Sequence, residues 1–241
     1  MLDWWRELRA VWTGKEPLLS AKQVENLQRY GVKDIAGFDA AHPVRELTPL
    51  EARGSALGAI LFLTGNYPFE VVLPMKPTRL KDEKESMAEW WGISSPEEAL
   101  AQLEQLEQLV RQGHRQRLTQ QLKRQPLDWY ARFEANPFIG QRPVGSLAAW
   151  DYARLVNVAR WSFDFNYLTW EQAWHYIDQA NRLARRDFDS WEAFATSFIA
   201  GRIMWNPDSS THDTIAAIAT SLLSSPFSAW RTLAWESYPG A

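Results

Sequence analysis

Five polar residues recur at short intervals in "AAWDYARLVNVARWSFDF", residues 148–165, and their types could do acid–base chemistry. They are Asp151, Arg154, Asn157, Arg160 and Asp164. A carboxylate beside an arginine can have a shifted pKa and can transfer protons, as a general acid or base does. The same residues also form structural pairs, because Asp151 and Arg154 are spaced i,i+3 and Arg160 and Asp164 are spaced i,i+4. We interpret them first as braces between helices and keep the catalytic interpretation as the alternative.

A second set of polar residues has the types that bind a divalent cation. Glu171, His175 and Asp178 follow one another at i, i+4 and i+7, so a helix would present them on one face. Zinc sites use three or four protein ligands, and no second cluster completes this one in the sequence. A solvated helix face is the favoured interpretation, and we expect no metal site here.

The motifs of common catalytic sites do not occur in the sequence. There is no G-x-S-x-G, no G-x-G-x-x-G, no glycine-rich loop followed by Lys-Ser/Thr, and no H-E-x-x-H. The absence of cysteine excludes disulfides, thiol nucleophiles and cysteine-ligated clusters. We therefore expect no cofactor, and an enzyme would have to use residues that are scattered in sequence.

Composition and charge narrow the class of protein. Hydrophobic residues make up 46 % of the 241 residues and charged residues 23 %, as in ordinary globular chains. The net charge of -3 provides no bulk attraction to nucleic acid, although short basic clusters occur around residues 111–124 and 182–186. No apolar run approaches the roughly 20 residues of a membrane span, and the N-terminal sequence does not resemble a signal peptide. We expect a cytoplasmic protein that contacts neither membrane nor nucleic acid.

Fourteen tryptophans are many for a chain of this length. Most follow the same spacing as leucine and isoleucine and are expected in the core. Those near the chain ends either fasten the ends to the body or form an exposed patch for a partner protein. These partner-binding candidates are Trp4, Trp5, Trp12, Trp230 and Trp235.

Signals for helix starts recur along the chain and predict a mainly α fold. Each is a capping box, in which a Ser, Thr or Asp is followed three residues later by Glu or Gln. The five boxes are "SAKQ" from Ser20, "TPLE" from Thr48, "SPEE" from Ser95, "TWEQ" from Thr169 and "DSWE" from Asp189. We expect a compact multi-helix bundle.

Few segments look extended. "YPFEVVLP", residues 67–74, is the only convincing β-type run, so we expect at most one short hairpin or extended segment there. Residues 126–146 mix proline and glycine with aromatic residues, which predicts a connection that lies against the core. The chain is expected to form one globular unit, with two packed helical lobes at 1–145 and 146–241 as a further prediction.

Several segments together carry a resemblance to a known family. "AWDYARLVNVARWSFDFNYLTWEQAWHYI", followed by "FDSWEAFATSFIAGRIMW", resembles a bacterial family catalogued as domain of unknown function 1266, and "ALGAIL", "EWWGISSPEEAL" and "GHR" are similar to its upstream half. The likeness spans about Ser55 to Asn206. It implies a compact helical bacterial protein and assigns no activity or site residue.

Two functional hypotheses follow. The first is a non-catalytic protein that acts by binding another protein, with an immunity or accessory role in a bacterial toxin or secretion system as one version. The alternative is an enzyme or toxin of unrecognised type that uses the polar residues of segment 148–165 in a cleft between the lobes.

Overall fold

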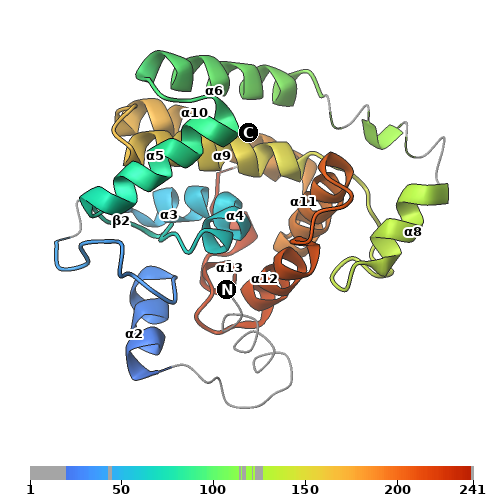
Figure 1. Ribbon diagram of the computed structural model, residues 1–241. Coiled ribbons are helices and arrows are strands. Elements are labelled where there is room, and N and C mark those ends of the chain that lie inside the picture. The colour runs from blue at the N-terminus through green and yellow to red at the C-terminus, as the bar shows by residue number, and fades with distance from the viewer. Residues whose placement is uncertain are drawn as a thin grey trace.

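The computed structural model describes residues 20–42, 45–113, 115, 118–120, 122 and 127–239 (Figure 1). Its helices are α2 (Ala21–Tyr30), α3 (Pro49–Ser55), α4 (Ala59–Thr64), α5 (Pro77–Trp91), α6 (Pro96–Arg111), α8 (Leu127–Ala135), α9 (Ala149–Asp164), α10 (Trp170–Asp187), α11 (Trp191–Trp205), α12 (His212–Ser224) and α13 (Ala229–Thr232). Two 3-10 turns are present: η1 (Ala56–Gly58) joins α3 to α4, and η2 (Trp235–Ser237) follows α13. The prediction of a mainly α fold is confirmed.

The only sheet in the described residues has two short antiparallel strands. β1 (Arg45–Glu46) pairs with β2 (Val71–Val72), and Arg45 lies opposite Val72. The predicted segment 67–74 thus contains a strand, which is limited to Val71 and Val72. No described helix combines the length and the apolar character needed to cross a membrane.

Helix starts are fixed largely by the predicted caps. In the boxes that Ser20, Thr48 and Thr169 open, the hydroxyl accepts the backbone N–H three residues on, and the side chain at that residue returns to the N–H of the cap. At Ser95 only half of the box forms: the hydroxyl accepts from the amide of Glu98, whose carboxylate binds the amide and hydroxyl of Ser94 instead. Side-chain caps thus account for most of the starts predicted from sequence.

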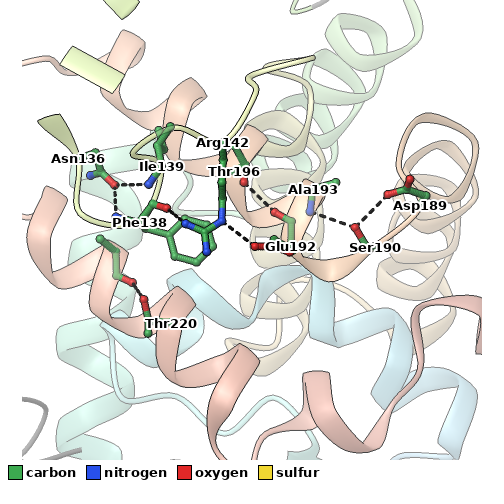
Figure 2. A network of polar contacts seen from close by, with 11 residues as sticks. Asn136, Phe138, Ile139, Arg142, Asp189, Ser190, Glu192, Ala193, Thr196 and Thr220 are labelled. Atoms are coloured by element: carbon green, nitrogen blue, oxygen red, sulfur yellow. Dashed lines mark hydrogen bonds and ion pairs between the residues drawn. The ribbon is translucent and has the colours of Figure 1, made fainter. Parts of the chain in front are cut away.

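The start of α11 differs by one residue from the prediction. Ser190, not Asp189, is the cap, and its hydroxyl accepts from the amide of Ala193 at 3.2 Å (Figure 2). Asp189 instead accepts the hydroxyl proton of Ser190. Because the third helical residue is then Ala193, Glu192 is not used in a box, and its carboxylate lies 2.6 Å from Nε of Arg142.

The predicted connection at 126–146 is helical in its first half, where α8 (Leu127–Ala135) lies, which corrects that part of the prediction. Its described residues lie against the core, as predicted. Phe133, Phe138 and Ile139 are buried. The side-chain oxygen of Asn136 accepts the backbone N–H groups of Phe138 and Ile139 at 3.0 and 3.2 Å, which fixes the turn (Figure 2). Together with the ion pair of Arg142, this turn ties the connection to α11.

Helix α9 occupies the centre of the fold. It contacts α6 on one side, α10 and α11 on others, and α3, η1 and α4 below in the view of Figure 1. Residues on all faces of α9 are buried, including Trp150, Asn157 and Arg160. Polar positions of α9 therefore lie inside the protein together with its apolar positions.

The core draws on both halves of the chain. A single cluster of buried apolar residues includes Leu57 and Leu103 from the first half and Leu155 and Phe198 from the second. Helix α10 also contacts α3 and α6 across residue 145. The division into lobes at that residue stays a prediction.

Candidate functional site

Asp151 lies in the first turn of α9 and is shared by two arginines. Its carboxylate lies 3.0 Å from Nε of Arg115 and 3.2 Å from Nη1 of Arg154, and the residue is 2 % exposed. The Arg154 guanidinium also lies over the rings of Trp91 and Trp150, at 5.1 and 5.6 Å from their centroids. Burial lowers the pKa of Arg154, and the charge of Asp151 opposes this shift. The carboxylate is thus fully engaged by cations and makes a link from α9 to Arg115.

Asn157 lies where α9 passes closest to η1. Its side-chain N–H donates to the backbone carbonyl of Gly58 at 3.1 Å, and the residue is fully buried. A Cβ on Gly58 would lie 2.9 Å from both polar atoms of this amide and 2.6 Å from the ring of Phe62. The close approach of the two elements therefore requires glycine at position 58.

Arg160 holds the extended segment 68–71 against α9. Its guanidinium donates to the backbone carbonyls of Phe69 at 3.2 Å and Val71 at 2.9 Å, and its Nε lies 2.9 Å from the carboxylate of Asp164. Burial raises the pKa of Asp164 to about 6 against the lowering effect of Arg160. Arg160 thus satisfies backbone carbonyls of this segment from the side of α9, in addition to the pairing of Val71 with β1.

The polar residues of α9 thus face three different parts of the fold. Asp151 and Arg154 reach Arg115, Asn157 reaches η1, and Arg160 with Asp164 reaches segment 68–71. A cleft of about 750 Å³ lies instead between the loop at residues 143–146, the end of α10 and the start of α11, and none of the five polar residues lines it. A small apolar pocket lies between α2, α4 and α12, and none of the five polar residues lines it either. The five residues do not converge on a common space.

Of the three candidate metal ligands on α10, Glu171 and His175 are exposed, and Asp178 is engaged by other side chains. The Asp178 carboxylate lies 2.7 Å from Nε of Arg182 and accepts the hydroxyl proton of Tyr238 at 2.6 Å. The ring of His175 packs edge-on against Tyr176. Within the described residues, no group of three or more His, Cys, Asp or Glu side chains is placed to hold a metal ion.

Sequence reasoning did not single out Arg53, a cation as deeply buried as Arg160. It is 1 % exposed, and it donates to the carbonyls of Ala234 and Trp235 at 3.1 and 2.9 Å and to the side-chain oxygen of Asn181 at 3.2 Å. The guanidinium lies 4.2 Å from the ring centroid of Trp191 and 4.8 Å from that of Trp235. Burial lowers its pKa to about 9. Arg53 thus binds the C-terminal segment to α3.

Two of the five terminal tryptophans belong to the same arrangement. Trp230 and Trp235 are 4 % and 3 % exposed, so they fasten the chain end and form no exposed patch, which corrects that alternative for these two positions. Their indole N–H groups donate to the carbonyls of Ala56 and Phe188, and Trp230 stacks on Trp191 with centroids 4.7 Å apart. The other three, Trp4, Trp5 and Trp12, lie outside the described residues.

One tryptophan that the sequence analysis did not select is strongly exposed. Trp90, near the end of α5, is 72 % exposed, whereas Trp205 and Phe227 are 49 % and 46 % exposed. The inner face of α5 is marked by Leu80, Met87 and Trp91, at i, i+7 and i+11. Trp90 lies off this stripe. Helical spacing applied to "EWWG" could therefore have identified Trp90 as an exposed residue.

Comparison with known proteins gives a family and no activity. A family model described as "Protein of unknown function (DUF1266)" matches residues 86–235. The chain therefore belongs to this family, and the resemblance inferred from sequence is confirmed. The match begins within α5, later than expected, and continues through α13, which the sequence analysis had placed outside the likeness. No curated protein and no solved structure matches the chain.

Proposed function

We propose that this protein acts by binding another protein and does not catalyse a reaction. The observation that carries the proposal is the use of the polar residues on α9. Asp151, Asn157 and Arg160 are each buried and engaged by partners from other parts of the fold, as structural braces are. A general acid or base needs access to substrate as well as a suitable pKa.

Exposed aromatic side chains give the proposal a second support. Tryptophan is enriched at the centres of protein–protein interfaces, because it buries a large area at a small cost in conformational entropy. Trp90 is largely exposed to solvent, and Trp205 and Phe227 are each nearly half exposed. These side chains lie on three different segments of the chain: on α5, at the end of α11 and after α12.

The finer version of the proposal is an immunity or accessory protein of a bacterial toxin or secretion system that works in the cytoplasm. An enzyme or toxin that uses the α9 residues is the alternative. That alternative requires Asp151, Asn157 and Arg160 at the floor of an open cleft, and none of them lines the cleft of about 750 Å³ described above.

Photo-cross-linking in the native host tests the proposal. A benzophenone amino acid is placed at Ser86, Asn206 or Ser224, one exposed position near each exposed aromatic residue. We expect at least one of the three positions to cross-link a discrete host protein. If none of them cross-links a protein, the proposal is overturned.

A further inference from the structure

We propose that the exposed face of α5 around Trp90 binds a lysine- or arginine-rich segment of a partner protein. This face, called the Trp90 surface, consists of Asp82, Glu85, Ser86, Glu89 and Trp90, all exposed. The inference rests on the proposed function and names the surface and the partner chemistry that it would use.

Helical geometry places the five residues side by side. Asp82, Glu85 and Glu89 are spaced i, i+3 and i+7, so their carboxylates form one stripe along α5. Ser86 precedes Trp90 by one turn and lies between the indole and this stripe. Met87 is the buried residue of the helix, on the opposite side of Trp90 from the acidic stripe. The indole is therefore bordered by the body of the protein on one side and by carboxylates on the other.

The charge of this region favours a cationic partner. Residues 81–98 hold two lysines and six carboxylates, a net charge of -4, whereas the whole chain carries -3. Lys81 lies 3.7 Å from Glu85, and Lys84 lies over the ring of Tyr167. Among the described residues, neither Asp82 nor Glu89 has an ion-pair partner. Such a surface repels nucleic acid and anionic lipid and attracts lysine and arginine.

Trp90 is suited to receive a cation on its ring. The face of an indole attracts ammonium and guanidinium groups. Other tryptophans of the chain already carry an arginine of their own: Arg154 lies over Trp91, and Arg202 lies 4.7 Å from the centroid of Trp205. No cation of the described residues covers Trp90, which is also the most exposed of the large apolar side chains there. A partner's arginine would make the contact that the neighbouring Trp91 makes internally.

The test uses the full chain with the benzophenone amino acid at Ser86, in the native host, followed by sequencing of the cross-linked peptide. We expect a partner peptide with net positive charge. Trp90→Ala should lower the cross-link yield at least tenfold, and the double variant Asp82→Lys with Glu89→Lys should do the same. Arg231→Ala, an exposed change on α13, serves as the matched control and should leave the yield unchanged.

Because Trp90 is mostly exposed, its replacement should leave the thermal unfolding temperature of the protein unchanged, which separates lost binding from lost folding. An acidic peptide, a nucleic acid or a lipid cross-linked at position 86 would overturn the inference. So would a yield that is insensitive to Trp90→Ala. If Asn206 or Ser224 cross-links a protein and Ser86 does not, this inference fails and the proposed function stands; if all three are silent, both fail.

Discussion

The side-chain amide of Asn157 and the backbone of Gly58 fit directly against each other at the crossing of α9 and η1. The amide N–H donates to the Gly58 carbonyl at 3.1 Å, and the space where a Cβ would stand is taken by the amide, whose two polar atoms lie 2.9 Å from it. Asparagine at one position and glycine at the other are thus one structural unit, although 98 residues separate them in sequence.

Gly58→Ala should destabilise the fold by about 1–3 kcal/mol, because the new methyl group meets Asn157 and Phe62 in a packed interior. Urea unfolding measures this cost. Gly145→Ala is the matched control, since nothing lies within 4 Å of a Cβ there, and it should change stability little. In the background of Asn157→Ala the cost of Gly58→Ala should fall, and strictly additive costs would contradict the contact.

Arg53→Met should release the C-terminal segment. Methionine keeps much of the apolar length of the side chain but leaves the carbonyls of Ala234 and Trp235 without their donor, at a cost of about 3 kcal/mol. Amide hydrogen exchange should speed up first in residues 229–238. Arg231→Met, which removes an exposed cation from the same segment, should leave the exchange unchanged. Equal protection in both variants would show that Arg53 does not hold this segment.

Local contacts of α9 could be predicted from sequence, and the long-range ones could not. The pairs of Asp151 with Arg154 and of Arg160 with Asp164 follow from helical spacing, and both are present. Helix α9 (Ala149–Asp164) covers the quoted segment 148–165 that carries them, apart from one residue at each end. The second arginine of Asp151, at position 115, comes from a part of the chain 36 residues earlier, and no periodicity in either segment indicates the pairing.

The backbone carbonyls that the buried arginines bind could not be predicted, for a different reason. Arg160 donates to carbonyls of segment 68–71, and Arg53 donates to carbonyls of residues 234 and 235. A carbonyl group is the same at every residue, so the sequence carries no signal for which one an arginine will reach. The burial of Arg53 was missed because it lies on a seven-residue helix, too short for an apolar stripe to show its inner face.

Glu70 should give the stability of the protein a measurable pH dependence. Burial raises its pKa from 4.5 to about 6, so the folded state holds this proton over a pH range in which the unfolded state has lost it. The contribution of Glu70 to stability therefore falls as pH rises from about 4.5 to about 6, by up to about 2 kcal/mol. Glu70→Gln should be more stable than the wild type at pH 7, and the gain should vanish below pH 4.5. Urea unfolding at both pH values checks this, and a gain that is equal at both would contradict the assignment.

Asp151→Asn should destabilise the fold because the new amide keeps the shape of the carboxylate and removes its charge from between Arg115 and Arg154. We expect a loss of about 3–5 kcal/mol, typical for a buried ion pair that loses one charge. The exposed pair of Lys81 and Glu85 supplies the control, since Glu85→Gln should cost less than about 1 kcal/mol. Unfolding temperatures that respond alike to both changes would contradict a bracing role for Asp151.

The unfolding free energy of Arg160→Met tests the central claim most directly. If the polar residues of α9 hold the fold together, this variant should lose about 3–5 kcal/mol of unfolding free energy in urea. The loss is expected because the Asp164 carboxylate and the carbonyls of segment 68–71 would be left without their partner. Adding Asp164→Leu should recover part of that loss by removing the unpaired charge. An Arg160→Met protein as stable as the wild type would contradict the claim and favour the catalytic interpretation of these residues.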